Sequence, residues 1–242
     1  MLTGAKAPTF HVVTLQDKSV IMMQIAGKNV YIYGVNEQSA PLIILNTFQG
    51  NGKEIYEKGR RWTDKPFVLA VIGDIEWNRE MSPWECMPVF KGEKPFQAGA
   101  DIYLAQLTGE IIPAIKQVIS AEPKSLIITG YSLAGLFALY SLYQTDMFQG
   151  AISASGSLWF PNFAEYVMEN SFAQKPDKVY LSLGNKEKNV KNKLMMQVEN
   201  RTRAIWDHYQ QQGVDTVFEL NPGNHFRDVD DRIAKGIAWI LK

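Results

Sequence analysis

Short apolar segments alternate with amphipathic segments along most of this chain. Six runs after residue 40 are almost wholly apolar, which is typical of strands buried on both faces of a parallel sheet. These runs are 41–45, 66–72, 125–129, 150–153, 178–183 and 214–220. Apolar residues at helical spacing predict helices between or after them, at 100–120 with a kink at Pro113, 133–143, 193–212 and 229–241.

The first forty residues follow a different pattern. Segments 10–15, 20–25 and 30–33 read as antiparallel strands, separated by Asp17-Lys18 and by the turn residues Gly27-Lys28-Asn29. Strands that later alternate with helices imply crossover connections between parallel strands. We therefore predict an α/β fold: a doubly wound, mostly parallel sheet with antiparallel N-terminal strands, in a single domain over 1–242.

Composition and charge exclude several classes of protein. The 242 residues are 46% hydrophobic and 21% charged, which is ordinary for a soluble globular protein. Lysine and arginine number 25 against 25 acidic residues, so nothing attracts a polyanion and we expect no nucleic-acid partner. The single cysteine, Cys86, excludes an intramolecular disulfide and fits a reducing compartment. With no signal-peptide pattern and no membrane-length apolar run, we expect a cytoplasmic protein without a membrane partner; its oligomeric state stays open.

The segment from Ser125 to Gly135 carries the strongest chemical signal. An apolar strand runs into Gly130-Tyr131-Ser132-Leu133-Ala134-Gly135, and an apolar helix begins at once. This context is that of a nucleophile elbow, in which a serine sits on a turn so sharp that its neighbours must be small. We interpret Ser132 as a catalytic nucleophile, and the Leu133 N–H at the helix start as an oxyanion donor.

A serine nucleophile needs a base, and the chain has three histidines. His11 lies in the opening strand and His208 lies within a predicted helix. His225 follows the last predicted strand in a loop rich in turn residues, at the carboxyl end of the sheet, where ligands of open α/β sheets bind. We therefore predict His225 as the base.

The acid of such a triad follows another strand and lies between serine and histidine in the chain. Glu187, just after the strand 178–183, is the candidate, and Asp228 is the alternative, with N-cap of the last helix as its other role. A second oxyanion donor is expected after the strand 41–45. We choose the Phe48 N–H, with Thr47 and Gln49 left open.

At these residues the sequence resembles the esterase branch of the α/β-hydrolases, which includes esterase D, S-formylglutathione hydrolase and the siderophore trilactone esterases. The resemblance runs from about Leu42 onward and uses residues 130–135, 103–113, 153–160 and 223–226. Residues 77–84 resemble the smaller bacterial hydrolases most like the trilactone esterases. The resemblance to the esterase branch implies Ser132 as nucleophile and His225 as base. The family's acid often stands nearer the glycine, where this chain has Asn185. Its substrates are carboxylic esters and thioesters.

The segment 73–99 is long and irregular, as functional loops or lids are, and we expect it to cover the catalytic end of the sheet. It contains Trp77, Trp84, Phe90 and Phe96. We assign Trp77, Trp84, Trp159 and Tyr131 to substrate binding, suited to an apolar or aromatic ester group. Arg79 could meet an anionic substrate. No metal-type cluster or phosphate loop occurs, so we expect no metal and no cofactor.

Together these features predict a serine carboxylesterase that takes a small-molecule ester and forms a covalent acyl-enzyme. A thioesterase or acyltransferase using the same residues is the alternative among enzymes. A hydrolase fold that binds without catalysis is the alternative outside enzymes.

Overall fold

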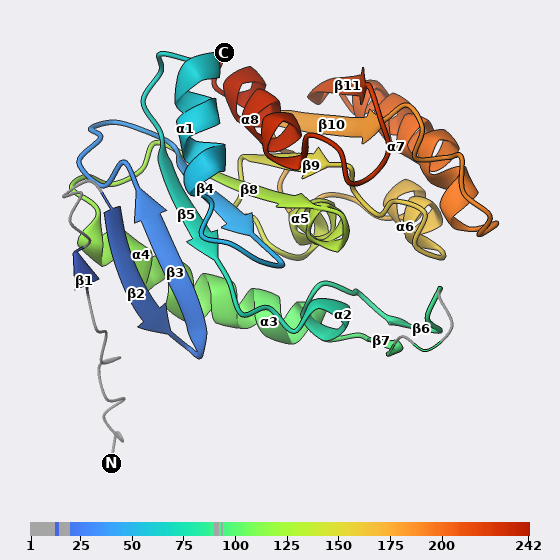
Figure 1. The fold of residues 1–242 in the computed structure, drawn as a ribbon, viewed down its shortest axis with the longest axis horizontal. Helices are drawn as coiled ribbons and strands as arrows, with labels where there is room; N and C mark the ends of the chain where they lie inside the picture. Colours follow the sequence, from blue (N-terminus) through green and yellow to red (C-terminus); the bar gives the residue numbers. More distant parts are fainter. Residues whose placement is uncertain (1–12, 15–19, 90–91, 93) are drawn as a thin grey trace.

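A single large sheet organises the fold (Figure 1). The computed structural model describes residues 13–14, 20–89, 92 and 94–242. In this part of the chain, nine strands pair in the order β1-β2-β3-β5-β4-β8-β9-β10-β11. In that order they are β1 (Val13–Thr14), β2 (Val20–Ile25), β3 (Lys28–Tyr33), β5 (Val68–Ile72), β4 (Leu42–Asn46), β8 (Leu126–Tyr131), β9 (Gly150–Ala154), β10 (Lys178–Gly184) and β11 (Asp215–Asn221).

The pairing matches the predicted fold class. The pairs β1–β2, β2–β3 and β3–β5 are antiparallel, and every pair from β5 to β11 is parallel. The doubly wound α/β sheet with an antiparallel N-terminal edge is thus confirmed. Each predicted parallel strand is present, with ends within two residues of those expected. Of the first predicted strand only Val13–Thr14 is described; His11, Asp17-Lys18 and Phe90 lie outside the described residues.

Helices cover both faces of the sheet, which explains why its central strands are almost wholly apolar. Every residue of β4, β5 and β9 is buried. On one face, α1 (Lys53–Trp62) and α8 (Val229–Ile240) pack side by side and share a core cluster with the strands. The other face carries a larger cluster beneath α3 (Ala100–Gln106), α4 (Ile112–Val118), α5 (Leu133–Gln144), α6 (Phe163–Glu169) and α7 (Val198–Gln211).

Two predicted helices are only partly regular α-helix. The segment 100–120 forms α3, a π-helical turn at Leu107–Ile111, and α4, in which Pro113 is near the first residue. Proline lacks an N–H, so the ladder is broken about where the kink was expected. The segment 193–212 begins with a 3₁₀ turn at Met195–Gln197 and continues as α7.

Three helices were not predicted: α1, α6 and α2 (Trp77–Glu80). Helix α1 is mostly polar and buries only Ile55 and Gly59, so few apolar residues mark it in the sequence. A Cβ on Gly59 would lie 2.9 Å from the ring of Phe67, so glycine lets α1 approach the sheet closely. Helices α2 and α6 are each two turns or shorter and leave little periodicity to detect.

The segment 73–99 contains α2 and a small ribbon of β6 (Glu85–Cys86) and β7 (Phe96–Gln97). An ion pair joins it to the sheet: Lys28 Nζ at the start of β3 lies 2.6 Å from Glu80 Oε2, with both side chains buried. Removing one partner would leave a buried charge unpaired, so this contact fixes α2 on the sheet. A lid role for the segment stays a prediction.

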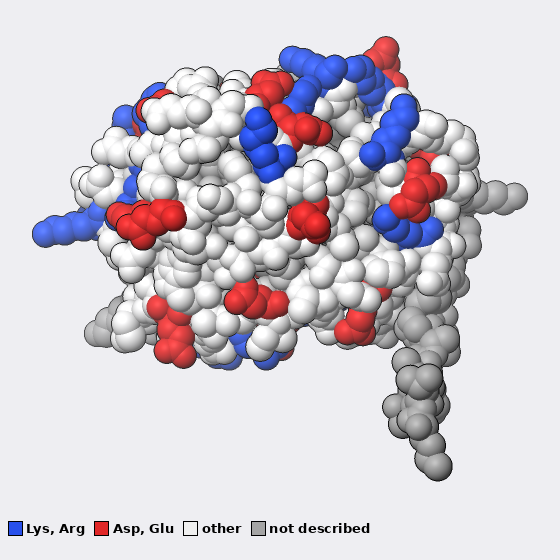
Figure 2. All heavy atoms as spheres, turned by 180° about the vertical axis from the view of Figure 1, so that it is seen from behind, with Lys and Arg blue, Asp and Glu red and all other residues white. Residues whose placement is uncertain are grey.

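Figure 2 shows the molecule from behind the view of Figure 1, and side chains of both charges lie on this side. Acidic side chains lie scattered over a largely uncharged surface, and basic side chains gather mainly along the upper edge, with acidic ones beside them. None of the helices described is long and apolar enough to cross a membrane. Within the same described residues, no group of three or more His, Cys, Asp or Glu side chains could hold a metal ion.

Candidate active site

Ser132 occupies a strained turn between β8 and α5. Its φ of 59° and ψ of −124° fall outside the regions that L-residues normally adopt. Such a conformation costs on the order of 1–3 kcal/mol and persists only where surrounding contacts enforce it. Here the Ser132 N–H donates to the Ala154 carbonyl at 3.2 Å, and the Ser132 carbonyl accepts from the Ser157 N–H at 2.9 Å.

Positions 130, 134 and 135 near Ser132 hold small residues because the turn has no room for larger side chains there. A Cβ on Gly130 would lie 2.4 Å from the Cβ of Ala134, and one on Gly135 would lie 3.0 Å from Gly156 Cα. The steric reason for the glycine-rich motif is therefore present in the structure. Alanine at position 134 fits only because Gly130 faces it.

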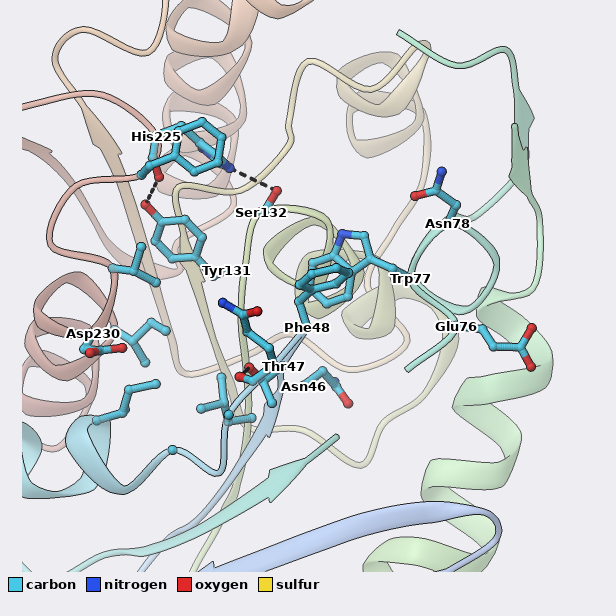
Figure 3. A pocket seen from close by; sticks show the side chains of 18 of the residues that line it. Asn46, Thr47, Phe48, Glu76, Trp77, Asn78, Tyr131, Ser132, His225 and Asp230 are labelled. Atoms are coloured by element: carbon cyan, nitrogen blue, oxygen red, sulfur yellow. Dashed lines mark hydrogen bonds between the residues drawn. The ribbon is translucent and has the colours of Figure 1, made fainter. Parts of the chain in front are cut away.

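Ser132, His225 and Glu187 form one hydrogen-bonded chain. The Oγ of Ser132 lies 3.1 Å from His225 Nε2 (Figure 3). His225 Nδ1 lies 2.8 Å from Glu187 Oε2. The three residues follow β8, β11 and β10, so the carboxyl ends of parallel strands in one sheet bring them together. A second hydroxyl, Ser157 Oγ, lies 3.2 Å from Ser132 Oγ. Because a hydroxyl has one hydrogen, Ser157 is the donor whenever Ser132 donates to His225.

Glu187 is a buried carboxylate with many donors. Burial alone would raise its pKa, but hydrogen bonds from His225, the Gly184 N–H and Ser155 outweigh burial, and the pKa of Glu187 lies below its usual value. Its Oε1 accepts from the Gly184 N–H at 2.6 Å and from Ser155 Oγ at 2.8 Å. Arg232 Nη1 is 2.8 Å from the same oxygen. Glu187 therefore stays ionised beside the imidazole.

The other acid and imidazole considered from the sequence lie away from this chain of bonds. Asp228 precedes α8 in a left-handed conformation, its side chain makes no capping bond, and its carboxylate pairs with Arg227 at 3.2 Å. Asn185, where the family often has its acid, is exposed and accepts a bond from the Gly223 N–H. His208 lies on α7.

The two expected oxyanion donors lie at suitable backbone positions. Leu133 is the first residue of α5, so its N–H has no carbonyl one turn earlier in the helix to bind. Among the alternatives in the β4–α1 loop, the Thr47 N–H already donates to the Ile72 carbonyl at 3.0 Å. Phe48 lines the cavity with Ser132, and so does Gln49. The oxyanion role of Leu133 and Phe48 stays a prediction.

A cavity of about 980 Å³ opens beside Ser132 and His225 (Figure 3). Its wall comes from the β4–α1 loop, from 76–79, Lys94 and Gln97 in the segment 73–99, and from the starts of α1 and α8. Phe48 and Trp77 lie together at one side, with ring centres 5.3 Å apart. Tyr131 also lines it. Trp77 and Tyr131 are thus in the wall, and their role in substrate binding stays a prediction.

The structure places Trp84 and Trp159 outside this wall. Trp84 packs among Tyr140, Phe160, Phe163 and Tyr166 and donates its indole N–H to the Pro161 carbonyl at 2.9 Å. Trp159 is buried against Phe96 and Phe160. Both therefore attach the segment 73–99 to the body of the fold, a use that the sequence alone does not distinguish from substrate binding.

We expect opposite effects from truncating two tryptophans of the same segment. Trp84→Ala removes a packed ring and lowers the free energy of unfolding by about 3 kcal/mol, leaving kcat within about twofold. Trp77→Ala removes cavity wall and raises KM for an aromatic ester by about tenfold, with little loss of stability. Urea unfolding and initial rates measure both. Equal effects of the two variants on KM would contradict the placement of Trp77 in the cavity wall and of Trp84 in the packed interior.

Sequence reasoning missed Arg232, Ser155 and Ser157, all of which contact the chain of bonds around Glu187 and Ser132. For Arg232 a signal exists. Val229, Ile233 and Ile237 form a stripe on α8 at spacings of four residues, and Arg232 lies three residues after Val229 and next to Ile233. A charged residue on a buried stripe indicates a buried partner. Ser155 and Ser157 lie in a loop after a predicted strand, where the sequence pattern does not indicate which side chain they contact.

Comparisons with known proteins bear on the family and the fold of this chain. The family model described as Putative esterase matches residues 48–229. The uncharacterized protein YbbA of Bacillus subtilis is 27% identical over 150 residues, which is 60% of each chain, so the chain spans about three fifths of that relative. Two solved structures are similar in fold. Siderophore hydrolase EstA from Aspergillus nidulans has a TM-score of 0.72 at 17% identity over 99% of both chains.

The second is an IroE-like serine hydrolase from Shewanella oneidensis, with a TM-score of 0.70 at 15% identity, covering 97% of this chain and 80% of the other. At these identities the structures bear on fold alone, whereas the family model covers most of the sequence, from the loop after β4 to the start of α8. The α/β-hydrolase fold and the matched residues lead to one conclusion: this chain belongs to the Putative esterase family.

Proposed function

We propose that this chain is a serine carboxylesterase, with Ser132 as nucleophile, His225 as general base and Glu187 as the acid that orients the histidine. The observation that carries the proposal is the continuous chain of bonds from Ser132 Oγ through His225 to Glu187, at 3.1 and 2.8 Å. A nucleophile, a base and an orienting group within hydrogen-bond reach are what covalent catalysis by a serine requires.

The reaction follows from this order of groups. His225 Nε2 accepts the Ser132 proton while Oγ attacks the ester carbonyl carbon, and the carbonyl π electrons move to its oxygen. The N–H groups of Leu133 and Phe48 would bind that oxyanion. The imidazolium then returns the proton to the leaving alcohol, which departs as the acyl-enzyme forms. Water, deprotonated by His225, attacks the acyl group and releases the carboxylic acid, and Ser132 regains its proton.

Features of the cavity support an ester with a bulky or aromatic acyl group. Its volume of about 980 Å³ exceeds what a short acyl ester needs, and Phe48, Trp77 and Phe226 offer aromatic surface. Arg79 and Lys94 lie in the same wall as Glu54, Glu76 and Asp230, so the wall is not of a single charge. The structural neighbours include a siderophore hydrolase from Aspergillus nidulans and an enterobactin esterase from Shigella flexneri, so siderophores, a catecholate trilactone among them, are a rational part of a substrate panel.

The test is hydrolysis of such a panel by the purified chain, followed by product analysis. We expect turnover of p-nitrophenyl acetate and p-nitrophenyl benzoate, with the aromatic acyl ester giving the higher kcat/KM. A catecholate trilactone belongs in the same panel. Products formed faster with an added alcohol or thiol acceptor than with water would favour an acyltransferase, and preference for thioesters a thioesterase. Turnover of none of these substrates, with no covalent labelling of Ser132, would indicate a binding protein without catalysis and overturn the proposal.

A further inference from the structure

Arg232 is a buried cation next to the proposed triad. It lies on α8, its side chain is 1% exposed, and a guanidinium at such a place is costly unless it is paired and hydrogen-bonded. The end of β10 makes room for it: a Cβ on Gly184 would lie 2.7 Å from Arg232 Nη2 and 2.4 Å from the Gly223 carbonyl oxygen. Glycine at 184 is therefore required by the guanidinium as well as by the loop beside it.

One arm of the guanidinium binds the acid. Arg232 Nη1 lies 2.8 Å from Glu187 Oε1, 2.7 Å from Ser155 Oγ and 3.1 Å from the Tyr131 hydroxyl. Ser155 in turn donates to the same Glu187 oxygen. The other carboxylate oxygen, Oε2, is left to His225. Arg232 thus fixes which oxygen of Glu187 faces the imidazole.

The other arm binds the loop that carries His225. Arg232 Nη2 donates to the Asn224 carbonyl at 2.9 Å and to the Pro222 carbonyl at 3.3 Å. The Tyr131 hydroxyl, which accepts from Nη1, donates to the His225 carbonyl at 2.6 Å (Figure 3). The backbone on the N-terminal side of His225 and His225 itself are therefore tied to the same side chain that holds Glu187.

We infer that Arg232 is a positioning residue of the proposed active site: its charge keeps Glu187 ionised, and its planar fork holds the acid and the His225 loop at a fixed separation. This inference rests on the proposed function. It goes beyond it by assigning two separable roles to a residue that does not line the cavity. Arginine suits both roles because its five donors lie in a rigid plane and its charge is permanent.

The two roles predict different changes. Removing a fixed cation next to an acid–imidazole pair makes that pair bind a proton more readily, so the acidic limb of kcat/KM against pH moves to higher pH. Misplacing the groups lowers kcat without moving that limb. The other charged groups on α8 or within three residues of Glu187 or His225 are Lys186, Lys188, Arg227, Asp228, Asp230, Asp231 and Lys235. The first four are exposed and the last three are half-buried, so water screens them more than Arg232.

Two substitutions separate the roles. Arg232→Gln keeps amide donors and removes the charge, and we expect the acidic limb to move up by about one pH unit with a lower kcat. Arg232→Lys keeps the charge and removes the fork, and we expect the limb near its original place with kcat lower by about 10²-fold. KM stays within about threefold in both, since Arg232 does not touch the cavity. The matched control is Lys235→Met on the same helix. This variant loses a cation bound to Glu219, and we expect it to change neither kcat nor the position of the acidic limb.

Circular dichroism and thermal unfolding check that each variant folds. If neither Arg232 variant folds, Tyr131→Phe tests the fork alone, because it removes the hydroxyl between Arg232 and the His225 carbonyl and keeps the ring that lines the cavity; we expect a lower kcat. Folded Arg232 variants with wild-type kcat and a wild-type pH profile would overturn the inference. A lower kcat in Arg232→Gln with the acidic limb of kcat/KM unmoved would also overturn it. Wild-type kcat in Tyr131→Phe would overturn it as well. Absence of covalent labelling of Ser132 in the wild type would instead overturn the proposed function and this inference with it.

Discussion

Ser132→Ala lowers kcat for an activated ester by about 10⁶-fold, and His225→Ala lowers it by a similar factor. The reason is that neither residue works alone: the Ser132 hydroxyl is a poor nucleophile until His225, 3.1 Å away, accepts its proton. The double variant is therefore no slower than either single one. The rate that remains comes from oxyanion binding and substrate positioning.

Initial rates for the three variants and the wild type, at substrate concentrations above and below KM, measure this non-additivity. Thermal unfolding of each variant is the control, because Ser132 lies in a strained turn whose contacts must survive the change. A double variant that loses the product of the two single losses would mean that the residues act independently. That result would contradict a nucleophile–base pair.

Glu187→Gln lowers kcat by about 10⁴-fold, with KM little changed. The amide is nearly the size of the carboxylate, but it can present a donor to His225 Nδ1, which favours the tautomer whose Nε2 carries a hydrogen and cannot accept the Ser132 proton. It also removes the negative charge that stabilises the imidazolium. The matched control is Asp228→Asn, a neighbouring acid whose carboxylate pairs with Arg227 instead, and its kcat should stay within about twofold. A large loss in Asp228→Asn alone would mean that the wrong acid has been assigned.

The same substitution also changes stability with a predictable sign. Removing the charge of Glu187 leaves Arg232 buried without its partner, which costs about 3–5 kcal/mol. The pKa of Glu187 is lowered in the folded state. The ionised carboxylate therefore contributes fully to the free energy of unfolding above the pKa of an unfolded glutamate, about 4.3, and this contribution declines as pH falls through the lowered pKa. Wild type and Glu187→Gln should therefore differ most in urea unfolding at neutral pH and converge in acid. A gap between them that does not narrow in acid would contradict this linkage.

Much of the fold could be predicted because its signals are local. An apolar run of four to seven residues is enough to indicate a buried strand, and the six parallel strands were found within two residues of their ends. The long helix at 100–120 was found with its break, because proline acts on its own turn. Helix α1 was missed for the opposite reason: it buries only Ile55 and Gly59, and its position depends on α8 and Phe67.

The candidate site likewise has residues that the sequence could predict and residues that it could not. Ser132, His225 and Glu187 each follow a parallel strand, so strand prediction alone places them at one edge of the sheet. Trp84 and Trp159 could not be assigned, because a ring in a long loop can face a cavity or the core, and only tertiary packing decides. Arg232 lies 45 residues from Glu187, and the sequence showed only that a charge lies on the apolar stripe of α8, with no indication of its partner.

The central claim is that Ser132 is a nucleophile activated by its neighbours, and covalent labelling tests it most directly. We expect a fluorophosphonate probe to add one equivalent of mass to the intact chain, and peptide mapping to locate the adduct at Ser132. Ser132→Ala should take up none, and His225→Ala should react far more slowly than wild type. A wild-type chain that stays unlabelled, or an adduct that persists in Ser132→Ala, would contradict the account.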